Sequence, residues 1–239
     1  MIFPREKLIF IPIPKTGTVS MATWLRQFMT PGYVTDMSQY ARFGHPNHPT
    51  LEQCHEKIKA GGEDPSTYRS FAFIRNPWAH AYSMWQYLSK TERTKKDWNS
   101  WLGARANGWE CCPRERVKNS DLGDWNFKGY LPRLLSKYRN VDYVGTLEYF
   151  DKHVNALKSF ILNQHIDAYV KDFESDFPGF TATGLKARLE QPLHLNMTVA
   201  DKQEYANKYT NEQKEIVRSL YANDIENFGY YFNGRKGED

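Results

Sequence analysis

The sequence lacks an apolar run of the ~20 residues that a membrane-spanning helix needs, and no signal peptide precedes its first apolar segment. It has few cysteines: Cys54, Cys111 and Cys112 are too few for a disulfide framework, and the adjacent pair is poorly placed to bridge to itself. No Cys-x-x-Cys motif is present, which disfavours a structural zinc ion. We therefore expect a reduced, soluble, cytoplasmic protein with no metal and no membrane contact.

The sequence also has little excess of one sign of charge over the other. The 239 residues include 32 Lys and Arg against 28 Asp and Glu, and the net charge of +4 is too small to indicate nucleic acid as a partner. The hydrophobic share of 40% and the charged share of 25% are typical of a soluble globular protein. No shift in composition marks a second unit, and the length suits one sizeable core, so we predict a single domain over residues 1–239.

Residues 9–20 predict a strand, a tight turn and a helix. They read IFIPIPKTGTVS, an apolar run that stops at Lys15 and Gly17 and continues into hydroxyl-bearing residues. At such a junction, unpaired backbone N–H groups and the positive helix end point at one place, where an anion binds. Lys15 adds a full charge, Gly17 allows close approach, and Thr16, Thr18 and Ser20 offer hydroxyl donors. The nucleotide triphosphatase motif differs, because its lysine follows the glycines.

Residues 68–83 predict a second junction of the same kind. The apolar stretch YRSFAFI runs directly into Arg75, and Pro77 suits the first turn of a helix. Ser83 lies eight positions after Arg75, about two helical turns later. The planar guanidinium of arginine fits a phosphate, and a serine hydroxyl completes such a site. Two junctions, each with a cation and hydroxyl groups, indicate a ligand with two separate phosphate-like groups.

The rest of the chain alternates predicted strands and helices. We predict a third strand at 141–144 and further helices at 50–60, 95–109, 126–138 and 148–164. Buried apolar strands separated by helices favour an α/β fold with a mainly parallel central sheet. In such folds the ligand lies at the carboxyl ends of the strands.

Together, the two junctions resemble the signature loops of the sulfotransferases that use 3′-phosphoadenosine 5′-phosphosulfate (PAPS), most closely those of the carbohydrate-type branch. The matching residues are Pro14-Lys15-Thr16-Gly17-Thr18-x-Ser20 and Arg75-Asn76-Pro77 followed by Ser83. Segments 141–148 and 195–230 resemble further parts of that family in the same order, so the resemblance covers most of the chain.

The resemblance implies a P-loop-like three-layer fold, a central sheet flanked by helices, and PAPS as co-substrate without a metal. The first loop would hold the 5′-phosphosulfate through Lys15 and its neighbours, and Arg75 and Ser83 would hold the 3′-phosphate. Lys15 would stabilise the leaving phosphate oxygen. The implied acceptor is a hydroxyl group, preferably on a glycan.

Two departures from the family pattern concern the donor site. His80 stands where the family usually has a second arginine. A neutral imidazole would weaken the hold on the 3′-phosphate, whereas a protonated one would partly replace the arginine. The first loop also lacks a second glycine or alanine that the family commonly has. Animal relatives carry an N-terminal anchor, so the chain is either a soluble form or an excised piece of an anchored enzyme.

The acceptor hydroxyl needs a base, and histidine, with a reference pKa of about 6.5, suits this role. We prefer His48, because its place before Thr50-Leu51 resembles that of a family histidine near the acceptor. His45 is the second choice, and Glu148 is the next. A metal site formed by His45, His48 and His55 is disfavoured, because prolines interrupt helical ligand spacing and no carboxylate sits close by.

Acceptor contacts are predicted for His48, Trp98, Trp101 and His194. Aromatic faces suit sugar rings, although core packing is the alternative role for the tryptophans. His194 is included because it precedes Leu195-Asn196, which resembles the family.

The sequence thus predicts a PAPS-dependent sulfotransferase. One alternative is a kinase-like nucleotide phosphotransferase, which is disfavoured by the missing lysine after the glycine and the missing Walker-B aspartate. The other is a nucleotide- or sulfated-glycan-binding protein of the same fold without turnover. The sequence leaves open the identity of the acceptor, the hydroxyl that is sulfated and the oligomeric state.

Overall fold

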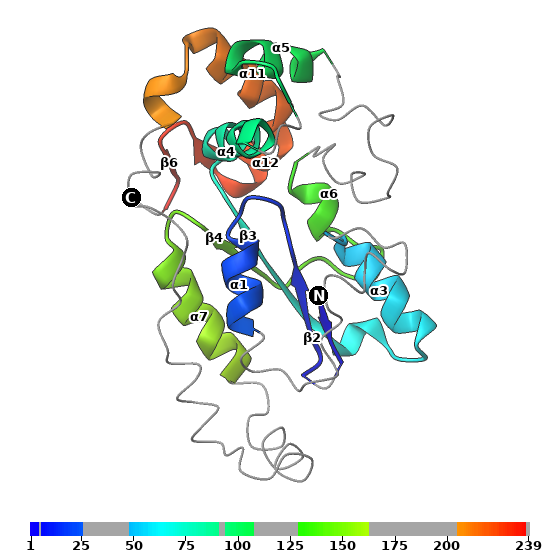
Figure 1. The fold of residues 1–239 in the computed structure, drawn as a ribbon. Helices are drawn as coiled ribbons and strands as arrows, with labels where there is room; N and C mark the ends of the chain where they lie inside the picture. Colours follow the sequence, from blue (N-terminus) through cyan, green and yellow to red (C-terminus); the bar gives the residue numbers. More distant parts are fainter. Residues whose placement is uncertain (5, 26–47, 91–93, 108–128, 163–204, 238–239) are drawn as a thin grey trace.

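The protein has a mixed α/β fold in the computed structural model (Figure 1). The structure describes residues 1–4, 6–25, 48–90, 94–107, 129–162 and 205–237. Within these ranges the main sheet has the strand order β1-β2-β3-β4. Its strands are β1 (Ile2–Phe3), β2 (Leu8–Ile11), β3 (Arg69–Ile74) and β4 (Tyr143–Thr146). The pair β1–β2 is antiparallel, whereas β2, β3 and β4 are parallel, so the predicted α/β class is confirmed and the sheet is mixed.

A helix follows each of the parallel strands β2, β3 and β4, as the sequence predicts. A short hairpin, β5 (Tyr230–Tyr231) and β6 (Gly234–Arg235), lies near the end of the described chain. The α-helices of the described ranges are α1 (Thr18–Leu25), α3 (Leu51–Ala60), α4 (Pro77–Lys90), α5 (Trp98–Ala106), α6 (Leu131–Leu134), α7 (Phe150–Leu162), α11 (Asn211–Leu220) and α12 (Ala222–Phe228). Two short 3₁₀ helices lie at Pro65–Thr67 and Tyr205–Lys208. No helix of these ranges is long and apolar enough to cross a membrane.

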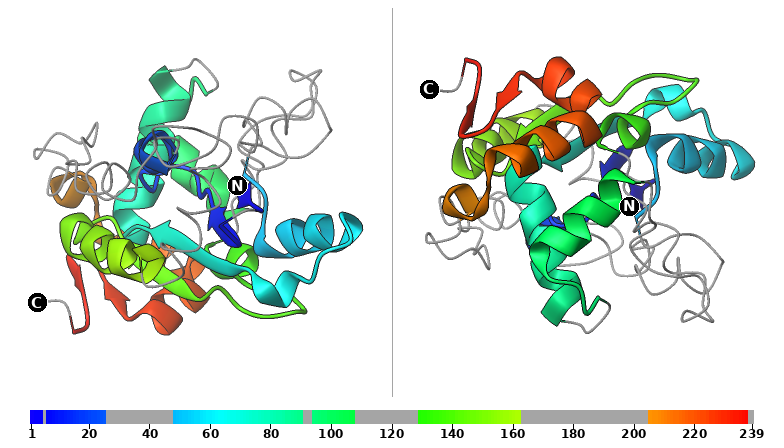
Figure 2. Two further views of the ribbon diagram at one scale, coloured as in Figure 1. Left: turned by 90° about the horizontal axis from the view of Figure 1, so that it is seen from below. Right: turned by 90° about the horizontal axis from the view of Figure 1, so that it is seen from above.

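Helices cover both faces of the sheet because side chains alternate along β3. Ala72 and Ile74 pack into a core that also contains Leu51 of α3. Phe73 points to the opposite face, where its ring centroid lies 5.2 Å from that of Phe150 in α7. Figure 2 shows α3 and α7 on opposite sides of the molecule in both views. The central strands β2 and β3 are therefore buried on both faces, as their near-continuous apolar sequences require.

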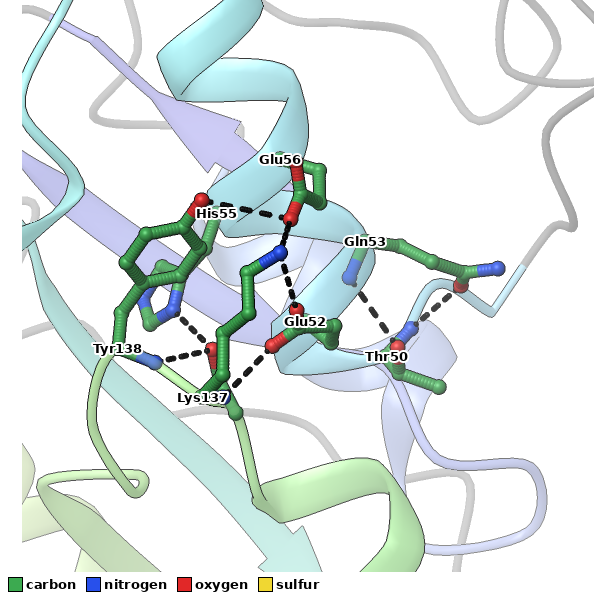
Figure 3. A network of polar contacts seen from close by, with 8 residues as sticks. Thr50, Glu52, Gln53, His55, Glu56, Lys137 and Tyr138 are labelled. Atoms are coloured by element: carbon green, nitrogen blue, oxygen red, sulfur yellow. Dashed lines mark hydrogen bonds and ion pairs between the residues drawn. The ribbon is translucent and has the colours of Figure 1, made fainter.

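A polar network fixes the start of α3 (Figure 3). Thr50 and Gln53 form a capping box, in which each backbone N–H donates to the other's side chain. The backbone N–H of Lys137 donates to Glu52 at 2.8 Å, and the Lys137 ammonium forms ion pairs with Glu52 and Glu56. These contacts anchor α3 to the segment before β4.

Several predicted elements have other bounds in the structure. The strand predicted at 141–144 lies at Tyr143–Thr146, and the helix predicted from 148 begins at Phe150. Two further helices differ more. The prediction of a helix over 126–138 holds only for Leu131–Leu134: residues 129 and 130 precede that helix, and Leu135 ends it with an extended backbone of φ −98° and ψ 146°. Residues 126–128 lie outside the described ranges. The predicted helix over 95–109 begins only at Trp98, because the Asp97 side chain accepts the Ser100 N–H and caps the helix there. The Asp97 cap and the extended backbone at Leu135 therefore make both helices shorter than the apolar pattern predicts.

Candidate functional site

The first loop, residues 12–17, joins β2 to α1 through two residues in the left-handed region. Lys15 has φ 63° and Gly17 has φ 80°. Glycine adopts this conformation without steric cost, whereas a lysine adopts it rarely and with strain. A strained non-glycine residue of this kind clusters at ligand sites, so Lys15 is a candidate by its backbone as well as by its charge.

The N-terminus of α1 is open. The first helical hydrogen bond runs from the Met21 N–H to the Gly17 carbonyl, at 3.0 Å. Gly17 has no side chain that could cap the preceding N–H groups, which have no acceptor within the helix. Val19, in the first turn, is 69% exposed. Backbone donors and the positive helix end are therefore presented at an accessible surface, the arrangement that binds phosphate and sulfate groups.

Thr16 and Thr18 shape this loop from inside. Both are buried, and both hydroxyls donate to the carbonyl of Ile13, Thr16 at 2.9 Å. In this geometry the two hydroxyl protons are used within the loop, so either side chain would have to rotate to donate to a ligand. The remaining predicted donors of the first loop and α1 are the backbone N–H groups, Lys15 and Ser20.

One face of α4 lies against the first loop, which Figure 1 shows beneath that helix. His80 contacts the Pro14 carbonyl, with 2.8 Å between Nε2 and the oxygen. The Lys15 ammonium lies 4.7 Å from the centroid of the Tyr87 ring. Ser83 is at i+3 from His80 and at i−4 from Tyr87, so it shares this face with both. The structure thus places Ser83 on the side of α4 that faces Lys15.

The second loop, Arg75 and Asn76, lies beside the first. Both loops follow the carboxyl ends of neighbouring parallel strands, with Ile11 of β2 paired to Ala72 of β3. The Asn76 side chain accepts N–H groups of the first turn of α4 and so caps this helix, in contrast to α1. Among the described residues, no carboxylate forms a salt bridge with Arg75. Two cationic junctions therefore meet at one edge of the sheet.

Glu148 supports the second loop from β4. One carboxylate oxygen accepts the Asn76 N–H at 2.7 Å. Burial raises the pKa of Glu148 above its ordinary value, although this hydrogen bond and the charge of Arg75 oppose the rise. The contact gives Glu148 a structural role at the second loop, and its use as an alternative base stays a prediction.

His48 lies against the first loop. Its Nδ1 is 2.9 Å from the Pro12 carbonyl oxygen, and because a carbonyl only accepts, Nδ1 carries the proton. In the neutral ring the lone pair is then on Nε2, the atom that would take a proton from a substrate. Arg133 donates to the His48 carbonyl and holds the backbone there. The structure therefore brings the preferred base next to the loop that carries Lys15.

The other predicted acceptor residues are placed differently. Trp98 and Trp101 are buried and stack on each other, with ring centroids 5.8 Å apart. Trp98 also contacts Tyr82 and Tyr209 edge-to-face. This burial favours core packing over contact with an acceptor. His45 and His194 lie outside the described residues, so the proposed roles of both, and a metal set that includes His45, stay untested; within the described ranges no group of three or more His, Cys, Asp or Glu could hold a metal ion.

His80 is neutral in the folded protein. It is fully buried, and loss of hydration lowers its pKa from 6.5 to about 3. The charges of Arg75, Arg105 and Lys15 also act on the ring, in the direction that lowers its pKa. Burial and these charges outweigh the opposing hydrogen bond to the Pro14 carbonyl and favour a neutral His80 at neutral pH, which argues against the alternative in which a protonated ring takes the place of an arginine.

Two residues that act on Lys15 or on His80 were not predicted from the sequence. Tyr87 lies beneath the Lys15 ammonium, and its position one turn after Ser83 could have indicated this. Arg105, in the last turn of α5, lies 5.7 Å from the Trp101 ring and acts electrostatically on His80. No local pattern marked Arg105, because the packing of α5 beside α4 brings it there.

The depressed pKa of His80 gives a stability prediction. Below pH 6.5 the unfolded chain binds a proton at this ring that the folded protein does not bind, so folding weakens as the pH falls toward 3. Between pH 6.5 and 4.5 this group should remove about 2 kcal/mol of stability. We expect H80Q, which does not titrate, to lose correspondingly less stability over that interval. Urea unfolding of both proteins at a series of pH values measures it, and equal pH dependence would contradict the buried neutral ring.

Comparisons with known proteins add no relative: no protein-family model, no curated protein and no solved structure matches the chain. The candidate site therefore stands on its own geometry. Its components are the open start of α1, Lys15, the face of α4 with Ser83, Arg75 on the neighbouring strand, and His48 against the first loop.

Proposed function

We propose that the protein transfers a sulfuryl group from PAPS to a hydroxyl acceptor, preferably on a glycan, and that its α/β fold is of the P-loop-like class. The observation that carries this proposal is the meeting of two cationic strand-to-helix junctions at one edge of the sheet. A donor with a 5′-phosphosulfate and a separate 3′-phosphate requires two anion sites a short distance apart. A single phosphate cradle would not favour this donor over other nucleotides.

The residues of the first junction fit the reacting end of such a donor. The Lys15 ammonium and the backbone N–H groups at the start of α1 would bind the 5′-phosphosulfate and stabilise the charge that develops on the leaving oxygen. The sulfur–oxygen bond to the phosphate breaks as a bond to the acceptor oxygen forms, and positioning and charge stabilisation dominate such an in-line transfer. The acceptor proton passes to the base.

The second junction fits the other phosphate. Arg75 offers a planar fork of donors, and Ser83 lies on the face of α4 toward the first loop. His48 would serve as the base through Nε2, because its Nδ1–H is held by the Pro12 carbonyl. Each named residue thus has a separate task that substitution can test.

Binding of the nucleotide product is the most direct check of two phosphate sites. Adenosine 3′,5′-bisphosphate at one hundred times its Kd should raise the melting temperature by about 5–10 °C, by linkage of binding to folding. ATP with magnesium should raise it far less, because it lacks a 3′-phosphate. Differential scanning fluorimetry across both titrations gives the comparison. Equal stabilisation by ATP would favour the phosphotransferase alternative and sink the proposal.

Transfer itself is tested by mass spectrometry of candidate acceptors incubated with the protein and PAPS. A gain of one sulfuryl group on an oligosaccharide would establish the activity and the acceptor class. Tight bisphosphate binding without transfer to any acceptor would instead favour the non-catalytic binding protein. Omitting magnesium should leave the transfer unchanged, since the proposed site uses Lys15, Arg75 and helix ends as its positive charges.

A further inference from the structure

Each loop of the candidate site accepts, at one backbone carbonyl, a hydrogen bond from the same buried cluster. We define this cluster as His80, Tyr130, Tyr221 and Asp224, and call the two hydrogen bonds the ties to the first and to the second loop. The His80 ring donates to the Pro14 carbonyl of the first loop, and the Tyr130 hydroxyl donates to the Arg75 carbonyl of the second loop at 2.6 Å. All four residues of the cluster are buried. Tyr221 and Asp224 come from the start of α12, far from either loop in the sequence.

The tie to the first loop has a defined proton arrangement. The Pro14 carbonyl can only accept, so Nε2 of His80 carries a proton. The ring is neutral, so Nδ1 has the lone pair and accepts from the Tyr221 hydroxyl, at 2.9 Å. Tyr221 therefore selects the tautomer of His80 that can bind the loop. A protonated ring would lose the hydrogen bond from Tyr221, and its charge would face Arg75, Arg105 and Lys15.

The tie to the second loop is built on Asp224. Its carboxylate accepts the backbone N–H groups of Tyr130 and Leu131 at 2.9 Å. Gly129, with φ 107°, lets the chain pass so closely that a Cβ atom there would lie 2.4 Å from a carboxylate oxygen. The Tyr130 ring meets the His80 ring edge-to-face, with centroids 5.4 Å apart. The two residues that bind the loops, His80 and Tyr130, are therefore in contact with each other inside the cluster.

The geometry of the peptide bond links the first tie to the ligand. In a trans peptide the carbonyl and the next N–H point in opposite directions. Fixing the Pro14 carbonyl toward His80 therefore directs the Lys15 N–H away from the cluster. The strained left-handed backbone of Lys15 needs such support, because a residue in this region relaxes unless its surroundings hold it.

We propose that His80 and Tyr221 are positioning residues that hold the first loop so that the Lys15 N–H faces the anion, and that His80 does not contact the donor. This role rests on the proposed function for the identity of the anion, but the loop geometry can be measured without it.

The first part of the experiment uses the free protein. Nitrogen-15 NMR of the His80 ring should show the Nε2–H tautomer in the unsubstituted protein, and Y221F should shift the Nδ1 signal, because the Nδ1 lone pair then loses the hydrogen bond from Tyr221. The backbone amide signal of Lys15 should shift in Y221F and H80L. The matched control is Y209F, which removes another buried tyrosine hydroxyl bonded to a carbonyl, that of Trp78 at 2.8 Å, without touching either loop. An unchanged Lys15 signal in both Y221F and H80L would overturn the proposal.

The second part measures affinity for pyrophosphate and for adenosine 3′,5′-bisphosphate by calorimetry. Y221F and H80L should bind both about tenfold more weakly, the effect of one to two hydrogen bonds, whereas Y209F should bind normally. H80Q, whose amide can donate to Pro14 and accept from Tyr221, should recover most of the affinity. Equal losses in Y209F would show a merely structural effect and refute the positioning role. If pyrophosphate binding showed the expected losses in Y221F and H80L but the bisphosphate did not bind even to the unsubstituted protein, the sulfotransferase function would be refuted and the positioning role would stand.

Discussion

Replacing Lys15 with alanine should lower the rate of sulfuryl transfer by about 10²–10³, roughly 3–4 kcal/mol of transition-state stabilisation, while binding of the bisphosphate product stays measurable. The reason is that negative charge on the leaving oxygen develops only as the bond to sulfur breaks, so the ammonium contributes most in the transition state. Single-turnover rates at saturating PAPS, with an acceptor found by mass spectrometry, measure the effect. Near-normal turnover at saturating donor would contradict the assigned role.

Two variants sharpen this test. Lys15 has φ 63°, where asparagine is tolerated better than alanine, so K15N removes the charge with less disturbance of the backbone. K15A and K15N should therefore share the loss in rate but differ in stability. R75A and S83A are the contrast at the second phosphate: both should weaken bisphosphate binding while leaving the rate at saturating donor near normal. The same loss in rate in all four variants would argue against separate roles for the two junctions.

The two strand-to-helix junctions could be predicted because their signals are local. The apolar run before Lys15 and the one before Arg75 form β2 and β3, and α4 begins at Pro77 as that residue predicts. Two parallel neighbouring strands then place both junctions at one edge of the sheet. These local patterns are therefore enough to predict that Lys15 and Arg75 lie at strand-to-helix junctions.

The surroundings of the junctions could not be predicted, because they depend on contacts between distant segments. The neutral state of His80 follows from its burial beside Tyr221, 141 residues later in the chain. The prediction of a helix over 126–138 is too long, because the apolar pattern does not show that the backbone becomes extended at Leu135. The sequence predicts Trp98 and Trp101 at an acceptor surface. Only the packing of Trp98 against Tyr82 and Tyr209, with Trp101 stacked on Trp98, shows their place in the core. Sequence patterns predict which residues are candidates for the site, whereas tertiary packing determines whether those residues are protonated and exposed.

Replacing His48 with alanine should lower turnover by at least about a hundredfold without weakening bisphosphate binding. An acceptor hydroxyl is a poor nucleophile until its proton has somewhere to go, and a base within hydrogen-bond reach contributes about 10²–10⁴ in rate. In the neutral ring, the contact from Nδ1 to the Pro12 carbonyl puts the lone pair on Nε2, the atom to which the proposal assigns proton acceptance. H48Q is the informative partner variant, because its amide can keep the bond to Pro12 but cannot accept a proton at neutral pH.

H48A and H48Q should therefore be equally slow, and both should bind the bisphosphate as the unsubstituted protein does. H45A should have a smaller effect than either. The measurement is a side-by-side titration of rate against pH for the three variants, since loss of the base should also remove the acidic limb of the profile. Recovery of activity in H48Q would mean that His48 only supports the first loop through Pro12. In that case, or if H45A were the inactive variant, the base would lie elsewhere, with His45 or Glu148 to be tested next.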